Sequence, residues 1–393
     1  MHRQLLRTSA RGIPARGLSQ RSCAYSTEQE RNSVDTNVSA FEQNVGNTKL
    51  VRLKRASEVA GCNILAKCEY ENAGGSIKDR AALWMVRDAE KRGLLIRGEP
   101  ATIVEGTAGN TGIGLALAAG VFGYKCVICI ASTQSEEKKN LLRSFGAQLI
   151  EVPAVPFKDP NNYVHVAQRV AETLRKKGHR AFYANQWDNT ANRAAHIAST
   201  GPEVWRQSEG KIDAFSCAMG TGGTLAGMSM YFKENHPHVK IGLTDPQGAA
   251  MVNWFTSGEL KGEGSSISEG IGQGRVTGNM EGFQPDMCFE IPDAEMMPVL
   301  HDLQRFDGLS LGGSSGINVA GAIQVGKELG PGSTVVTVLC DSASRYSSKL
   351  NNPQFLESKG LPVAPWLRSH EEQESLDPDY FGLLRDATGE ALV

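Results

Sequence analysis

The sequence of 393 residues predicts an α/β fold of two lobes, each built on a parallel sheet flanked by helices. Apolar, strand-like segments alternate with segments of helical periodicity along most of the chain. Three glycine-rich turns each follow a predicted strand and open a predicted helix. In parallel sheets such turns gather at the carboxyl edge of the strands, where ligands bind.

The first half of the chain alternates strands with helices and predicts a lobe over 41–190. Thr133 and Glu136 have the spacing of a capping box for the helix over 135–145, which Gly146 is placed to end, and Gly93 is placed to end the helix over 81–90. We predict strands over 63–70, 101–104, 125–131, 147–152 and 181–184, and helices over 81–90, 113–122, 135–145, 163–177 and 191–207.

The second half repeats the alternation and predicts a second lobe over 191–350. A glycine-rich stretch over 258–282 interrupts it and is predicted to be irregular. We predict strands over 212–218, 239–243 and 334–340, and helices over 225–234, 294–306 and 317–329.

The two ends differ in composition from the rest. Residues 1–27 contain five arginines and several serines, and no acidic residue precedes Glu28. This composition is typical of a mitochondrial transit peptide; a disordered basic arm is the alternative. Residues 351–393 end in an acidic stretch, which we expect to be partly ordered and solvent-facing, with a partner-binding role as the alternative.

Composition and charge exclude several classes of function. The chain contains 41 basic and 43 acidic residues, and five of the basic ones lie in the first 27 positions. The remainder is therefore acidic, which argues against nucleic acid as a partner.

No apolar run reaches the roughly 18 residues of a membrane-spanning helix. Of the eight cysteines, only Cys126 and Cys129 have a metal-like spacing, but in a strand they would point to opposite faces. We expect reduced thiols and no metal site.

The segment Gly74-Gly75-Ser76-Ile77-Lys78-Asp79-Arg80 places one lysine between a glycine pair and a predicted helix. A neutral lysine amine is a nucleophile that can form a Schiff base with a carbonyl. The simpler interpretation, a solvated surface charge at a helix start, is the more common one for a lysine considered alone.

The glycine-rich turns suit anionic groups. In Gly220–Thr224, glycines allow the backbone to wrap a phosphate and two threonines add hydroxyl donors. It is not a Walker A loop, and no dinucleotide fingerprint follows a strand. The turn over 106–112 offers Thr107, Asn110 and Thr111 to a carboxylate and a ring oxygen. Each turn could instead be a capped helix start without a ligand.

Two further residues are ambiguous in the sequence alone. Ser314 begins the helix after the third turn, where a serine is most simply an N-cap but could meet a heterocycle nitrogen. Asp341 closes the last predicted strand and could be a cap or a site residue.

Four motifs occur together in the order and spacing of one enzyme family. They are Asn-Ala-Gly-Gly-Ser-Ile-Lys-Asp-Arg, Gly-Thr-Ala-Gly-Asn-Thr-Gly, Gly-Thr-Gly-Gly-Thr and Gly-Gly-Ser-Ser-Gly, and 185–189 and 269–272 fit as well. Over about residues 47–349 the chain resembles the cysteine synthase / cystathionine β-synthase family of fold-type II pyridoxal-phosphate enzymes. The resemblance implies a two-lobed fold like that of the tryptophan synthase β subunit.

The resemblance also implies roles for particular residues. Lys78 would hold pyridoxal 5'-phosphate as a Schiff base, Asn110 would bind the ring hydroxyl, and Ser314 would meet the pyridine nitrogen. The phosphate would lie on Gly220, Thr221, Gly222, Gly223 and Thr224, and the substrate carboxylate on Thr107, Ala108, Gly109, Thr111 and Gln186.

The implied reaction is a β-replacement that makes L-cysteine from O-acetyl-L-serine and sulfide through an α-aminoacrylate. The resemblance is greatest to fungal, mitochondrial-type cysteine synthases (O-acetylserine sulfhydrylases), and it implies a homodimer. Two positions depart from the pattern. Ala108 replaces the usual serine, and no Gly-Glu pair follows Asp341-Ser342.

These departures leave more than one substrate compatible with the sequence. Cystathionine β-synthase, serine dehydratase and cysteine desulfhydrase activities are the near alternatives. A non-catalytic binding protein with the same fold is an alternative of another class, and a nucleotide-binding protein is a more distant one.

Overall fold

The computed structural model describes residues 38–107 and 109–388. Residues 1–27, with the predicted transit peptide, and Ala108 lie outside the described residues. The chain divides at residue 38 into a short leading unit and the unit Ser39–Val393, which contains every element discussed below.

Two sheets organise this unit. A four-stranded sheet has the order β5-β4-β3-β6 and is parallel throughout. A six-stranded sheet has the order β1-β2-β10-β7-β8-β9 and is parallel except for the antiparallel pair β1–β2. The strands are β1 (Leu50–Arg52), β2 (Asn63–Cys68), β3 (Thr102–Gly106), β4 (Lys125–Ala131), β5 (Gln148–Val152), β6 (Ala181–Tyr183), β7 (Ala214–Cys217), β8 (Lys240–Pro246), β9 (Met287–Ile291) and β10 (Thr334–Leu339).

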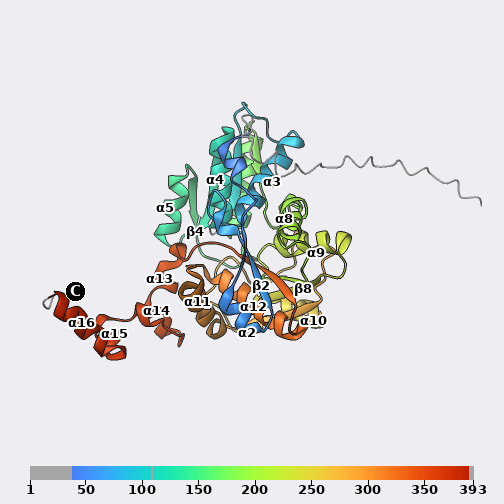
Figure 1. The fold of residues 1–393 in the computed structure, drawn as a ribbon. Coiled ribbons are helices and arrows are strands. Elements are labelled where there is room, and N and C mark those ends of the chain that lie inside the picture. The colour runs from blue at the N-terminus through green and yellow to red at the C-terminus, as the bar shows by residue number, and fades with distance from the viewer. Residues whose placement is uncertain (1–37, 108, 389–393) are drawn as a thin grey trace, which may run out of the picture. The chain divides into compact units, whose positions relative to one another are not determined.

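Helices cover both faces of each sheet, as the predicted fold class requires. In Figure 1, α3 (Lys78–Lys91), α4 (Asn110–Phe122) and α5 (Glu136–Ser144) gather around β4. The other face of the four-stranded sheet packs on α6 (Tyr163–Lys176). The six-stranded sheet lies between α2 (Lys54–Ala60), α11 (Asp293–Asp307) and α12 (Gly313–Leu329) on one face and α8 (Gly201–Gln207), α9 (Gly223–Asn235) and α10 (Met251–Ser257) on the other.

The helix 191–207 was predicted to be continuous, and the structure divides it into three parts. These are α7 (Ala191–Ala195), one π-helical turn η3 (His196–Thr200) and α8. π-Turns within helices are found frequently at functional sites. The remaining short elements are α1 (Ala40–Gln43), η2 (Glu69–Glu71), η4 (Gly278–Met280) and η5 (Ala343–Tyr346).

One predicted local feature is wrong. The helix α5 has Ser135 at its N-cap and no side-chain cap bond, so Thr133 and Glu136 form no capping box. Thr133 lies in a turn two residues before the cap, and the Glu136 carboxylate accepts from Lys139 Nζ at 2.9 Å instead.

The segment after residue 346 is partly packed. It forms α13 (Ser347–Leu350), α14 (Pro353–Ser358), η6 (Pro365–Leu367), α15 (His370–Leu376) and α16 (Pro378–Thr388). Leu356 and Ala364 are fully buried, whereas Leu376 and Leu383 are exposed.

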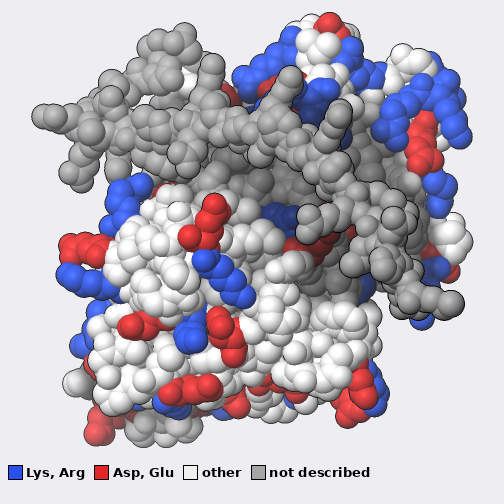
Figure 2. All heavy atoms as spheres, turned by 90° about the vertical axis from the view of Figure 1, so that its right-hand side faces the viewer, with Lys and Arg blue, Asp and Glu red and all other residues white. Residues whose placement is uncertain are grey.

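On the face shown in Figure 2, acidic and basic side chains interleave over the lower part of the surface. No helix among the described residues is long and apolar enough to span a membrane.

Candidate active site

Lys78 is the first residue of α3 and lines two adjoining cavities. The larger cavity has a volume of about 970 Å³. Asp79 shapes the loop before Lys78, because its Oδ2 accepts from Gly74 N at 2.9 Å and from Ser76 N at 3.2 Å. Ile77 N also donates to Cys340 O at 3.1 Å, which ties this loop to the end of β10. These bonds fix the position of Lys78 relative to the end of β10.

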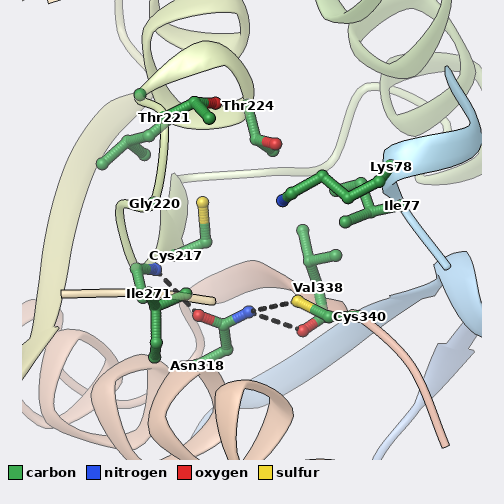
Figure 3. A pocket seen from close by; sticks show the side chains of 13 residues that line it. Ile77, Lys78, Cys217, Gly220, Thr221, Thr224, Ile271, Asn318, Val338 and Cys340 are labelled. Carbon is green, nitrogen blue, oxygen red and sulfur yellow. Dashed lines mark hydrogen bonds between the residues drawn. The ribbon is translucent and has the colours of Figure 1, made fainter. Parts of the chain in front are cut away.

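The Gly220–Thr224 turn lies opposite Lys78. Figure 3 shows the lysine amine extending toward Thr224 and Thr221 across the smaller cavity. Gly222 has φ +86°, a left-handed conformation suited to glycine, and is the N-cap of α9. A Cβ on Gly220 would lie 2.4 Å from Gly270 O, and one on Gly223 would lie 2.3 Å from Asn192 Oδ1. Neighbouring atoms therefore require glycine at these positions.

His196 supports this turn from within η3 and was not singled out from the sequence. Its Nε2 lies 3.2 Å from Thr224 Oγ1 and its Nδ1 lies 2.9 Å from Thr200 Oγ1. Burial lowers the pKa of His196 to about 3, so the imidazole is neutral. A neutral ring bonded on both sides holds the Thr224 hydroxyl in place without adding charge.

The second turn presents its polar groups to the larger cavity. Thr107, Gly109, Asn110, Thr111 and Gln186 all line it. Thr111 Oγ1 donates to Gln186 Oε1 at 2.6 Å, and Gln186 Nε2 donates to Glu105 Oε1 at 3.4 Å, so one N–H of that amide remains as a donor. Thr107, Gly109, Thr111 and Gln186 are the residues predicted for the substrate carboxylate apart from Ala108, and Asn110 is the residue predicted for the ring hydroxyl.

Ser314 is not an N-cap. Gly312 occupies the N-cap of α12, and Ser314 is the second helical residue, buried and lining the larger cavity. One turn further, Asn318 accepts from Ala218 N at 2.8 Å and donates to Val338 O at 2.8 Å (Figure 3). This amide joins the ends of β7 and β10 beneath the site. A polar residue within the apolar run of this helix was its only sequence signal.

Asp341 contacts Asn110 and therefore belongs to the site. Asn110 Nδ2 donates to Asp341 Oδ2 at 2.7 Å, and Tyr346 OH donates to the same oxygen at 2.6 Å. Arg345 donates to Asn110 Oδ1 and to Gly74 O. Burial raises the pKa of Asp341, and the bonds from Tyr346 and Asn110 oppose this shift.

Charged side chains lie at the rim of the larger cavity. Glu269 pairs with Lys138 of α5 and accepts from Lys349 Nζ at 2.7 Å. The pairing links the helix α5 with the loop before η4 and with α13.

Among the described residues, no group of three or more metal-ligating side chains could hold an ion. Cys126 and Cys129 are buried, free thiols within β4.

The site suits an anionic cofactor bound next to an amine. The N-caps of α4, α9 and α12 are Gly109, Gly222 and Gly312, which have no side chain to accept from the first turn. In α9, Gly223 N donates to Thr221 Oγ1 at 3.3 Å. Residues of all three helix starts line the two cavities that Lys78 shares. Free N–H groups in the first turns of helices bind phosphate and carboxylate, so a phosphorylated aldehyde that condenses with Lys78 fits the arrangement.

Comparison with known proteins agrees with this chemistry. Residues 41–341 match the family model described as pyridoxal-phosphate dependent enzyme. The chain belongs to this family. Its cofactor is therefore pyridoxal phosphate, and its fold is that of the family.

Several curated relatives have the name cysteine synthase, and a relative from Rattus norvegicus, 37% identical over 81% of this chain and 56% of its own length, has the name cystathionine beta-synthase. Cysteine synthase 1 of Emericella nidulans is 51% identical over 82% of this chain and 87% of its own length. Cysteine synthase 1 of Neurospora crassa is also 51% identical, over 81% of this chain and 84% of its own. A Saccharomyces cerevisiae relative with the provisional name mitochondrial cysteine synthase is 39% identical over 78% and 82%.

A solved structure has the same architecture. The O-acetylserine dependent cystathionine beta-synthase of Helicobacter pylori superposes with a TM-score of 0.70 and is 28% identical. The match covers 79% of this chain and 98% of that chain.

Proposed function

We propose that the protein is a pyridoxal-phosphate dependent cysteine synthase, a transferase that makes L-cysteine from O-acetyl-L-serine and sulfide. The observation that carries the proposal is the placement of Lys78 between the glycine-rich turns 220–224 and 106–112, in two adjoining cavities that it shares with both. The fungal relatives named cysteine synthase support the reaction class.

Each predicted residue has a role in this proposal. The backbone N–H groups of Gly220, Gly222 and Gly223, with the Thr221 and Thr224 hydroxyls, bind the phosphate. Asn110 donates to the ring oxygen, and the Ser314 hydroxyl meets the pyridine nitrogen.

The substrate carboxylate is bound by the second turn. Thr107, Gly109 and Thr111 supply backbone N–H and hydroxyl donors, and the Gln186 NH2 group supplies another. Ala108 belongs to this loop by its position in the sequence.

When bound, pyridoxal phosphate supplies an aldehyde that condenses with amines and a ring that accepts electron density from the adjacent carbon. Lys78 Nζ then acts as the general base that removes the proton from the substrate Cα. A serine at 314, unlike a carboxylate, does not keep the ring nitrogen protonated, which favours prompt loss of the Cβ leaving group. Sulfide adds at that carbon.

The test compares two substrate pairs on the purified holoenzyme. O-Acetyl-L-serine with sulfide should yield cysteine at least about tenfold faster than L-serine with L-homocysteine yields cystathionine, and O-acetyl-L-serine alone should change the visible absorption. The reverse preference would identify a cystathionine β-synthase, and release of pyruvate in place of either product would identify a dehydratase or desulfhydrase. A colourless protein that takes up no pyridoxal phosphate would overturn the proposal.

We further propose a homodimer and import into mitochondria directed by residues 1–27. The yeast relative's name supports the mitochondrial location. A fluorescent protein carrying residues 1–27 should enter mitochondria, and the same fusion with its five arginines changed to glutamine should not. Light scattering should give twice the monomer mass of 42.3 kDa.

The lobes predicted over 41–190 and 191–350 do not follow the sheets, because β1 and β2 of the first half pair within the six-stranded sheet of β7 to β10. The tail predicted over 351–393 is packed in part, because Leu356 and Ala364 are fully buried.

A further inference from the structure

We propose that Asp341 and Arg345 are positioning residues that fix the amide of Asn110 so that it offers the cofactor an N–H group and never its carbonyl. This inference rests on the proposed function, since it concerns how the same site holds the ring oxygen of pyridoxal phosphate. Both residues belong to the segment 341–346, in which the sequence departs from the pattern of the family it resembles.

The amide of Asn110 has one acceptor atom and two N–H donors. Arg345 Nη1 donates to Oδ1, and one N–H of Nδ2 donates to Asp341 Oδ2 at 2.7 Å. One N–H remains, on a residue that lines the cavity shared by Lys78 and Ser314. The two bonds within the protein therefore leave a single donor for a ligand.

The two partners also define which way round the amide lies. Reversing it would turn the NH2 group toward a guanidinium and the carbonyl toward a carboxyl oxygen that already accepts from Tyr346 OH at 2.6 Å. The NH2 donors would then face the N–H donors of Arg345, and the carbonyl acceptor would face the carboxyl acceptor of Asp341, so neither contact could form a hydrogen bond. A carbonyl facing the cofactor is thus strongly disfavoured.

Arg345 and Asp341 are themselves held by the loops that form the site. Arg345 Nη2 donates to Gly74 O, four residues before Lys78, and a Cβ on Gly75 would lie 2.7 Å from the same nitrogen. Gly312 N donates to Asp341 O at 3.0 Å, at the start of the helix that contains Ser314. The segment 341–346 thus fixes Asn110 relative to both other ligand loops.

The consequence concerns the ring oxygen. An N–H donor, with a guanidinium behind it, stabilises the ionised form of that oxygen over its protonated form. The ionisation state of this oxygen determines whether the bound cofactor absorbs in the visible or in the near ultraviolet. Absorption therefore reports the orientation of Asn110 separately from activity.

The experiment titrates apo-protein with pyridoxal phosphate and records the affinity and the ratio of visible to near-ultraviolet absorption. Arg345→Met should weaken binding about tenfold or more, the worth of a charge-assisted bond, and shift absorption toward the near ultraviolet. Arg345→Lys, which keeps a charged donor, should recover most of the visible band. Arg368→Met, in the exposed pair with Glu372, is the matched control and should match the wild type in both measurements.

Asp341→Asn provides a second, isosteric variant should Arg345→Met fail to fold in a thermal melt. It weakens the preference for one orientation of the amide, so the spectral shift should have the same direction. Wild-type band ratios in Arg345→Met and in Asp341→Asn would overturn the inference, as would a loss in Arg345→Lys as large as that in Arg345→Met. A wild-type protein that binds no pyridoxal phosphate would instead overturn the proposed function itself.

Discussion

Side chains that line this site are oriented by hydrogen bonds to other residues of the protein, in addition to the ligand that each is proposed to bind. Gln186 accepts from Thr111 through Oε1 and donates to Glu105 through Nε2, which leaves one N–H of its amide as the donor for a ligand. Thr224 is held by a neutral His196, and Asn110 is held between Arg345 and Asp341. In each case a hydrogen bond within the protein occupies some of the polar atoms of the side chain, and the atoms that remain determine whether it donates to or accepts from a ligand.

The first prediction at this scale concerns Lys78. Lys78→Ala removes both the attachment point of the cofactor and the proposed base, so cysteine formation should fall by at least about a hundredfold, the lower end of what a positioned base contributes. The visible absorption of the purified protein should be lost with it. Arg92→Met changes the exposed C-cap residue of α3, and it should leave the rate of cysteine formation and the visible absorption unchanged. Cysteine formation at the wild-type rate would show that Lys78 is not the functional amine.

The second prediction concerns Ala108. Ala108→Ser adds a hydroxyl donor beside the proposed carboxylate position, and it should lower the KM for O-acetyl-L-serine about two- to tenfold, the worth of one net hydrogen bond. Steady-state kinetics on the two proteins measure this directly. An unchanged KM would mean that backbone N–H groups bind the carboxylate.

At the scale of the element, the strand β3 places an ionisable side chain in the core. Glu105 is fully buried, and Gln186 N and Nε2 donate to it at 3.3 and 3.4 Å. Burial raises the pKa of Glu105 to about 8. The same strand ends at Gly106, where a Cβ would lie 2.6 Å from Tyr163 O, so α6 packs directly on its backbone. The strand therefore positions the carboxylate turn through close packing and one protonated acid.

This acid makes stability depend on pH. Below about pH 4.5 Glu105 is protonated in both the folded and the unfolded chain. Above that pH the unfolded chain releases the proton while the folded protein keeps it, so the free energy of unfolding falls as the pH rises toward 8. Asp79 and Asp245, with pKa values raised by burial to about 7, contribute with the same sign.

Glu105→Gln keeps the shape and the hydrogen bonds but removes the titration. The variant should gain stability relative to the wild type as the pH rises from 5 to 8, so the difference in Tm between the two proteins should grow over that range. Thermal melts of the apo-proteins at several pH values measure it, and Glu99→Gln, at an exposed acid, is the control. A constant difference in Tm would mean that Glu105 is ionised in the folded protein.

At the scale of the whole molecule, a buried ionic cluster joins elements distant in the sequence. Arg80 of α3 pairs with Glu69 of η2 and with Glu203 of α8, each at 2.7 Å, and Lys67 of β2 pairs with Glu203 at 2.8 Å. Arg80, Lys67 and Glu69 are almost completely buried. The cluster lies two residues along the helix from Lys78 and links the segment that carries the lysine to α8.

Arg80→Met should reduce the free energy of unfolding by about 3–5 kcal/mol, because it leaves buried carboxylates without their partner. Urea unfolding of the apo-protein measures this loss. Arg87→Met removes an arginine of the same helix whose side chain is exposed, and it should cost less than about 1 kcal/mol. A similar small cost for Arg80→Met would show that the remaining charges rearrange without it.

The sequence by itself determined the fold class, through local signals such as the alternation of strands and helices, which need no knowledge of distant residues. It determined the cofactor through the family resemblance that four motifs in order carry. It also placed Lys78 at a helix start, which the structure confirms.

Only the tertiary structure decided which strands share a sheet and which partners the site residues have. The early strands β1 and β2 join the sheet of β7 to β10, and Asn110 meets Asp341 and Arg345 more than 230 positions away. Register, burial and the orientation of an amide depend on atoms that packing brings together. For this reason Ser314, Asp341 and His196 were ambiguous or unnoticed in the chain, and each has defined contacts or a defined position in the fold.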